Sequence, residues 1–431
     1  MRKTLKNNKG ITLIALVITI IVLLILAGVA IATLTGNSSI IENSNKAVQA
    51  YNETASEDDA LLGRLENKLK EYTGGGSSTP EEPTPPDTPI VDENGLATKN
   101  EKIIPDKTNN PNLQIVIPEG FAPAILKTGK LQSLPGENGE VDHKMSAEQW
   151  NNITADDINK GIVVVDADGN EFVWISITDS SKFSRVAWTT KYGYDENGTY
   201  RSDLTTPHWL AEEPTVNKWW EDKSDANTEY TKMVNSVIQN KGFYVARYEA
   251  SKNNDSSKAQ SKRNQNVWGN ISHPDAIIKS QNYNTMLHSH LIYGIEWDGI
   301  LKWLEGNAVI SSSTSGLNKT MDIDDLQTSS DRWGNYNYNS TAGNAAINSG
   351  ILQTTGKSEY WKANNIYDLV GNAYEWTQER WSTDVFGDTY FAVRGCDFGF
   401  IGGKQPVAIR NAYSYSDANY SVIGFRFSFY L

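Results

Sequence analysis

An uncharged apolar run over residues 11–34 constrains this 431-residue chain more than any other sequence feature. Most of its positions are Ile, Leu, Val or Ala, and about 20 such residues suffice for a helix to cross a bilayer. The ten residues before it carry four Lys or Arg and no acid, and basic flanks stay cytoplasmic. The sequence therefore predicts a single transmembrane helix over residues 11–36, with a cytoplasmic N-terminus and an extracellular C-terminal part. A cleaved secretory signal fits less well, because its apolar region runs only about 7–15 residues.

The junction between the basic segment and the apolar run reads Lys9-Gly10-Ile11-Thr12-Leu13-Ile14. This junction resembles the prepilin leader of type IV pilins and pseudopilins, in which a short basic leader ends in Gly. The resemblance implies that a prepilin peptidase removes residues 1–10, cutting between Gly10 and Ile11 and methylating the new N-terminus. The family usually has Glu at the fifth mature position, where this chain has Ala15. That departure favours processing over assembly as a standard major pilin, and a plain signal anchor is the alternative.

A stalk and a linker are predicted after the membrane segment. Residues 37–72 carry leucines at a spacing of three to four, which gives a helix with one apolar stripe. Three consecutive glycines at 74–76 end that helix. Residues 73–96 hold five prolines among Gly, Ser, Thr and acids, which is typical of an extended linker without a core. A globular head is therefore expected to follow, with an initial region over residues 97–159.

The composition indicates a folded head that does not bind nucleic acid. Hydrophobic residues make up 39% of the chain, and all 13 tryptophans lie at or after Trp150, which places the core in the C-terminal two thirds. The net charge is −13 and no basic stripe occurs after the first ten residues, which argues against nucleic-acid binding through phosphate neutralisation. Cys396 is the sole cysteine, which excludes an intrachain disulfide and a cysteine-based zinc site.

Local patterns predict a few regular elements in the head. Two β-branched or aromatic runs around Asp168-Gly169 predict a hairpin over residues 162–175. Apolar residues at helical spacing predict helices over 229–239 and 289–305, and a strand is expected over 243–249. The remainder is rich in Asn, Ser, Gly, Tyr and Trp, which indicates ordered loops between short strands. The fold class predicted from these patterns is α+β.

Four segments of the head together suggest a family. They are GFYVARYEAS at 242–251, NIYDLVGNAYEWT at 365–377, VRGCDF at 393–398 and GFRFSF at 424–429. In this order they resemble the formylglycine-generating enzyme (sulfatase-modifying factor) family. The resemblance covers about residues 160–431 and implies a C-type-lectin-like globular head with little regular secondary structure. Each segment is more simply read as residues that hold such a fold together, so the segments indicate fold and not activity.

The chemistry of that family is not expected here. Its enzymes convert a substrate cysteine to formylglycine with oxygen and copper, and they need two nearby cysteines because Cu(I) is soft and held by paired thiolates. Cys396 stands here in the place of a glycine, and Phe400 holds the expected cysteine position. One thiol cannot supply the pair. We therefore expect no catalytic residues and no copper, with an exported oxidase of altered chemistry as the alternative.

The resemblance also implies a structural calcium site. Carried over by position, Asp368 and Glu375 would supply carboxylates, and Gly371 and Ala373 would supply backbone carbonyls. These are the hard oxygen ligands that Ca²⁺ prefers. The alternative is that Asp368 only closes a turn and that Glu375 pairs with an arginine.

A Tyr-, Ser- and Asn-rich segment over residues 410–420 is the predicted ligand-binding surface. Such a composition gives rigid amphipathic contacts and adaptable hydrogen bonds, as in antibody loops. It also resembles the variable region of retroelement-diversified lectin-fold proteins, and an ordinary polar surface loop is the alternative. The predicted contact residues are Arg410, Asn411, Tyr413, Tyr415, Asp417, Asn419 and Tyr420.

These features together predict a membrane- or pilus-anchored cell-surface protein that displays a non-catalytic, lectin-like head for binding or adhesion. Its expected partners are the membrane, a prepilin peptidase, other pilins, and a glycan or protein ligand. Two alternatives remain open. The first is an exported oxidase of the formylglycine-generating type. The second is a minor pilin or pseudopilin whose head is structural.

Overall fold

The structure is a computed structural model that describes the head of the chain. The described residues are 88–186, 188–190, 193–194, 200–201, 206–207, 225–311, 318–337, 350–383, 389–400, 402, 405–414 and 422–431. The chain divides into two compact units, Met1–Thr84 and Pro85–Leu431, and every described residue belongs to the second. The predicted leader, transmembrane helix, stalk helix and most of the linker lie outside the described residues. Among those described, no helix has the length and hydropathy needed to span a bilayer.

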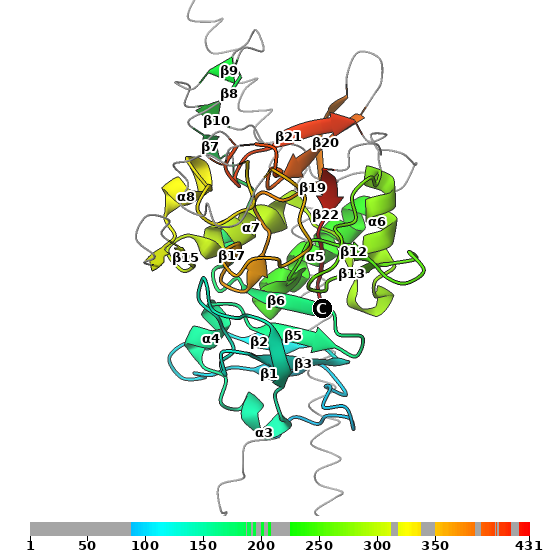
Figure 1. Cartoon of the computed structure of the whole chain (residues 1–431). Coiled ribbons are helices and arrows are strands. Elements are labelled where there is room, and N and C mark those ends of the chain that lie inside the picture. The colour runs from blue at the N-terminus through cyan, green and yellow to red at the C-terminus, as the bar shows by residue number, and fades with distance from the viewer. Residues whose placement is uncertain are drawn as a thin grey trace, which may run out of the picture. The chain divides into compact units, whose positions relative to one another are not determined.

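The head has an α+β fold that is rich in short strands (Figure 1). Its larger sheet has seven strands, in which all neighbours are antiparallel. In spatial order they are β14 (His290–Leu291), β23 (Phe427–Phe429), β11 (Gly242–Ala246), β6 (Glu171–Ser176), β5 (Val163–Asp166), β3 (Phe121–Leu126) and β4 (Val141–Lys144). The predicted hairpin is confirmed as β5 and β6, and the predicted strand as β11 beside β6.

A second sheet of four strands forms the opposite side of the head, drawn in orange and red in Figure 1. Its strands are, in order, β21 (Asn411–Ser414), β20 (Thr389–Arg394), β19 (Tyr374–Thr383) and β22 (Ile423–Phe425). The pair β19 and β22 is parallel, and the other pairs are antiparallel. Helix α7 (Gly294–Leu304) contacts both β6 and β19, so it packs between the two sheets.

The other elements are short. The remaining helices are α3 (Ala147–Trp150), α4 (Ala155–Asn159), α5 (Asp225–Asn240), α6 (His273–Gln281), α8 (Ile323–Gln327), η1 (Ser180–Lys182) and η2 (Thr285–Leu287). The two-stranded pairs are β1 (Glu101–Ile103) with β2 (Ile115–Ile117), β7 (Thr189–Thr190) with β10 (Thr206–Pro207), β8 (Gly193–Tyr194) with β9 (Tyr200–Arg201), β12 (Ser251–Lys252) with β13 (Ala259–Gln260), β15 (Val309–Ser311) with β16 (Asn318–Thr320), and β17 (Lys362–Ala363) with β18 (Ile366–Tyr367).

Both predicted helices are present, and one of them starts later than expected. The helix predicted over 229–239 is the longer α5, whereas the one predicted over 289–305 begins at Gly294. The residues before it join the larger sheet as β14, and the Glu296 carboxylate accepts the Tyr293 N–H at 2.9 Å. This capping interaction fixes the first turn of α7.

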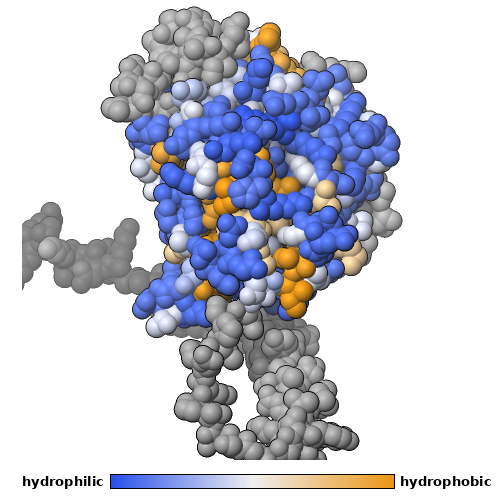
Figure 2. All heavy atoms as spheres, turned by 60° about the horizontal axis from the view of Figure 1, so that its bottom comes forward, coloured by the Kyte–Doolittle hydropathy of each residue, from blue (hydrophilic) through white to orange (hydrophobic). Residues whose placement is uncertain are grey.

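Aromatic side chains fill the core. Six tryptophans are less than 2% exposed, in agreement with the core position predicted from the tryptophan distribution: Trp150, Trp174, Trp297, Trp333, Trp361 and Trp376. The ring of Phe172 meets those of Phe427 and Phe429 edge-on, with centroids 5.4 and 5.0 Å apart. Edge-to-face pairs of this kind stabilise a core beyond the area they bury. The face in Figure 2, at the end carrying β1 and α3, is mainly hydrophilic, with hydrophobic residues in small groups.

A buried ion pair joins the two sheets where the chain passes from β22 into β23. Arg426, between these strands, donates to the Glu375 carboxylate of β19 at 2.8 and 3.0 Å. It also donates to the backbone carbonyls of Ala246 in β11 and Tyr367 in β18, at 2.8 and 2.9 Å. Both charged side chains are fully buried. One guanidinium therefore connects three separate segments, as the rigid fork of arginine allows.

We expect the Arg426→Leu variant to lose about 3–5 kcal/mol of unfolding free energy, because Glu375 would remain buried without its partner. Urea unfolding followed by tryptophan fluorescence measures the loss. The matched control is Lys127→Leu, which breaks an exposed ion pair with Asp142 and should leave stability nearly unchanged. Equal losses in the two variants would contradict the role given to Arg426.

Candidate functional site

The loop predicted to bind calcium is buried and holds an excess of carboxylates. Asp368 accepts the Gly356 N–H through Oδ2 at 2.6 Å, while its buried Oδ1 has no hydrogen-bond partner. Glu375 has both oxygens bonded by Arg426, as the alternative to a calcium ligand proposed. Nearby, Glu249 accepts the Ala373 N–H at 3.0 Å. Burial raises the pKa of Asp368 to about 7 and that of Glu249 well above its usual range.

These contacts fit a calcium ion only in part. The unpartnered Oδ1 of Asp368 is the kind of buried oxygen that a cation would satisfy. Glu375 is engaged by arginine, and the Gly371 N–H donates to the Gly395 carbonyl at 2.7 Å. Within the described ranges, no group of three or more His, Cys, Asp and Glu side chains could hold a metal ion. A calcium site made of one carboxylate and backbone carbonyls would not contain three such side chains. Calcium binding therefore stays a prediction.

Cys396 is a core residue. It is fully buried, and its Sγ lies 3.3 Å from the Gln405 Oε1 and 3.9 Å from the Tyr374 hydroxyl. Its φ of +67° lies in the left-handed region that favours glycine, the residue that the resembled family has at this position. Burial raises the pKa of the thiol well above its usual range. Since the thiolate is the reactive form, this cysteine is in an inert environment.

Arg410 is buried, so its predicted place on a ligand-binding surface is wrong. It donates to Asp298 at 2.7 Å and to Glu379 at 2.6 Å, and Arg394 donates to the same two carboxylates at 3.0 and 2.7 Å. All four side chains are fully buried. Although burial opposes ionisation, the Arg410 charge holds the pKa of Glu379 at about 2. Arg185 also donates to Glu379, at 3.2 Å, and the network fixes α7 against β19, β20 and the start of β21.

The rest of the predicted ligand-binding segment is only partly described. Asn411 and Tyr413 lie in β21 and are half-buried. The Asn411 amide donates to the Tyr374 hydroxyl and to Gln405, both at 2.9 Å, and the ring of Tyr413 packs near that of Trp376. These two residues thus contact the core with part of their surface. The other four predicted contact residues, Tyr415, Asp417, Asn419 and Tyr420, lie outside the described residues.

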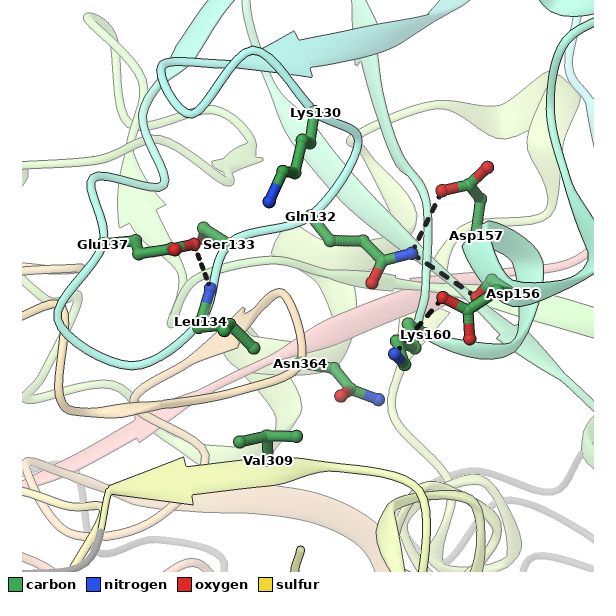
Figure 3. Close-up of a pocket in the computed structure, with 10 residues that line it drawn as sticks. All are labelled: Lys130, Gln132, Ser133, Leu134, Glu137, Asp156, Asp157, Lys160, Val309 and Asn364. Atoms are coloured by element: carbon green, nitrogen blue, oxygen red, sulfur yellow. Dashed lines mark hydrogen bonds and ion pairs between the residues drawn. The ribbon is translucent and has the colours of Figure 1, made fainter. Parts of the chain in front are cut away.

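A pocket of about 300 Å³ lies in another part of the head (Figure 3). It is bounded by the loop after β3, by α4, by β15 and by the turn between β17 and β18. Its lining combines charged, amide and apolar side chains. The residues are Lys130, Gln132, Ser133, Leu134, Glu137, Asp156, Asp157, Lys160, Val309 and Asn364.

Buried polar contacts hold one wall of this pocket in place. Lys362, fully buried in β17, donates to the Ser133 hydroxyl at 2.6 Å and to the Glu137 carbonyl at 2.8 Å. Glu359 accepts from Lys362 at 2.9 Å and from the Gly139 N–H at 3.1 Å. A Cβ at Gly139 would clash with the Tyr367 hydroxyl and the Ser133 Oγ, so a larger residue here would force these side chains to shift. Loop 133–139 is therefore tied to the β17–β18 hairpin.

None of the pocket residues is among the functional residues predicted from the sequence. They come from four stretches of the chain that only the tertiary fold brings together. The one local signal is the pair Asn364-Asn365 between two short β-runs, since Asn tolerates a positive φ in tight turns. Asn364 does adopt a φ of +50°. That signal predicts a turn, and nothing in it indicates a pocket.

Comparisons with known proteins show no family for this chain. No family model matches the sequence, and no curated protein matches it. Among solved structures, PvdO from Pseudomonas aeruginosa is 15% identical with a TM-score of 0.33, over 62% of this chain and 96% of that one. Treponema denticola variable protein 1 is 12% identical with a TM-score of 0.21, over 77% and 99%. CarF is 10% identical with a TM-score of 0.21, over 72% and 97%. All three TM-scores are too low to show a shared fold.

The wall of the pocket should weaken in acid. Burial opposes the ionisation of Glu359, but the charge of Lys362 and hydrogen bonds from Tyr367 and Lys362 lower its pKa to about 2. A lowered carboxyl pKa contributes stability that is present above the unfolded value of 4.5 and is lost as the pH falls towards 2. We expect Glu359→Gln to remove this part of the acid destabilisation. The measurement is the urea midpoint from pH 6 to about pH 2.

The control for this experiment is Glu140→Gln, which changes an exposed carboxyl of the adjoining segment. Its stability profile should follow that of the wild-type protein. If Glu359→Gln also followed the wild-type profile, the ionised Glu359 would not be what holds the wall.

Proposed function

We propose that the chain is a membrane- or pilus-anchored cell-surface protein whose head binds a ligand and has no catalytic activity. The observation that carries the proposal is the burial of Cys396, the sole thiol of the chain. A thiol enzyme needs an accessible cysteine of low pKa, and this thiol is enclosed with a raised one. The apolar run over residues 11–34 and the basic leader support the anchor.

We also propose that the head belongs to the formylglycine-generating type of C-type-lectin-like folds. The structure supports this through the roles of the residues that carry the resemblance. Arg394 and Arg426 are fully buried and bind carboxylates of neighbouring strands, and Arg247 donates to the Asn365 carbonyl at 3.0 Å. These arginines position the chain, so the segments would be kept for the fold even where the catalytic thiols are absent.

The full-length chain in detergent tests this function. We expect it to bind at least one ligand on an array of glycans and cell-surface proteins with micromolar or better affinity. We also expect no conversion of a cysteine peptide in the presence of copper and oxygen, and no effect of Cys396→Ser on binding. Turnover that Cys396→Ser abolishes would instead support the oxidase, and the absence of any ligand would favour a structural head.

Cells that produce the full-length chain test the proposed anchor. The N-terminal mass of the protein in sheared surface material should correspond to a chain that starts at methylated Ile11. A chain that starts at Met1 and stays in the membrane fraction would reduce residues 1–36 to a signal anchor. In that case the ligand-binding function of the head would still stand.

A structural calcium ion at Asp368 is our proposal for a cofactor. The free Oδ1 of Asp368, with the carbonyls of Gly371 and Ala373, would hold it, and the ion would neutralise the excess carboxylate charge. We expect a chelator to lower the melting temperature of the full-length chain at pH 7, and added Ca²⁺ to restore it. Asp368→Asn should remove this dependence. An equal melting temperature with and without chelator would exclude the ion.

A further inference from the structure

We propose that the pocket between the loop after β3 and the β17–β18 turn binds a sugar acid, that is, a single sugar ring that carries a carboxylate. The proposal rests on the ligand-binding function proposed above and names the site and the ligand class. The pocket lies in the described part of the head, away from Arg410 and its network, and none of its residues was predicted from the sequence. Three observations carry it.

The first observation is that the acids of the lining already have partners. Glu137 accepts the Leu134 N–H through Oε2 at 2.8 Å (Figure 3). Asp157 caps α4 by accepting the Thr154 N–H at 2.9 Å, and its other oxygen accepts from Gln132 at 3.2 Å. Asp156 pairs with Lys160 at 3.2 Å. Each of these acids is therefore engaged by a donor of the protein through at least one oxygen.

The second observation is that two donors of the lining lack a partner. The Nδ2 of Asn364 is buried and makes no hydrogen bond, although a buried amide is normally paired. Lys130 forms no ion pair with a described residue, and Figure 3 shows its ammonium pointing into the pocket. An ammonium and an amide N–H₂ facing one space require acceptor oxygens. In Figure 3 the two donors lie on different sides of the pocket. A carboxylate would satisfy the ammonium, because bonds to charged groups are the stronger ones, and a hydroxyl or ring oxygen of the same ligand would satisfy the amide.

The third observation is the combination of size and apolar floor. Val309 and the 42% exposed Leu134 give the pocket apolar surface beside its donors. The volume of about 300 Å³ lies at the lower end of the range typical of ligand sites, which suits one ring rather than a chain. The C–H face of a sugar ring would lie on this floor. The amide oxygen of Gln132, whose nitrogen donates to Asp157, is oriented to accept from a ring hydroxyl.

The conformation of Asn364 adds to the argument. Its φ is +50° in the turn between β17 and β18. Residues other than Gly and Asn adopt this left-handed backbone conformation less often. The turn therefore favours Asn or Gly, and of these two only Asn presents an amide to the pocket. The substitution Asn364→Gly therefore removes the amide and keeps the turn, which separates the two roles.

The experiment titrates the full-length chain in detergent with galacturonate and, separately, with galactose, and follows heat by calorimetry. The two sugars differ only in the carboxylate. We expect saturable binding of galacturonate and binding of galactose that is at least about tenfold weaker. Two variants test the donors. Lys130→Gln and Asn364→Gly should each weaken galacturonate binding by about tenfold, with unchanged melting temperatures.

The matched controls lie away from the pocket. Lys107→Gln removes an exposed lysine, and Asn270→Gly changes another Asn with a positive φ, of 51°. Both should bind galacturonate as the wild-type protein does.

Absence of galacturonate binding, or equal binding by wild type and both pocket variants, would overturn the proposal. Equal binding of galactose and galacturonate would overturn the assigned carboxylate. Array ligands that still bind both pocket variants would refute this site and leave the proposed function standing.

Discussion

The ion pair between Arg426 and Glu375 is the contact on which the rest of the head depends. It lies where β22, an edge strand of the smaller sheet, continues into β23, the second strand of the larger one. A buried guanidinium loses its hydration, so it is tolerated only where carboxylate and carbonyl oxygens replace that water. Here Glu375, Ala246 and Tyr367 supply them. The requirement fixes the relative position of three segments that short strands alone would hold weakly.

The same physics explains why the family-like segments indicate fold more than activity. Arginine and glutamate are usually exposed, so in a sequence they read as surface or catalytic residues. In this head Arg394, Arg410, Glu375 and Glu379 are all buried and paired with each other or with Asp298 and Arg426. The prediction for Arg410 failed for this reason. Its neighbours in the Tyr- and Asn-rich segment suggested a binding loop, while its partners in α7 and β19 are distant in the sequence.

Local patterns predicted the elements whose causes are local. Alternation and the Asp168-Gly169 turn predicted the β5–β6 hairpin, and apolar spacing predicted α5. The start of α7 was missed because the preceding residues pair with β23, a strand more than a hundred positions later. The pocket was also missed because its residues are distant from one another in the sequence. Lys130 and Asn364 have no sequence pattern in common, and only the packing of the hairpin against loop 133–139 brings them to one space.

The β17–β18 hairpin connects the ion pair to the pocket. At one end the Tyr367 carbonyl accepts from Arg426, and the hydroxyl of the same residue donates to Glu359 at 2.5 Å. Lys362 extends these contacts to loop 133–139, while the turn between the strands carries Asn364. The unpaired amide is thus held by the contacts that join the two sheets. A group fixed in this way loses little entropy on binding, which is what a small ligand with few contacts requires. The net charge of −13 acts weakly on a ligand here, because surface charges beyond about 10 Å are screened, whereas the ammonium of Lys130 lies at the pocket itself.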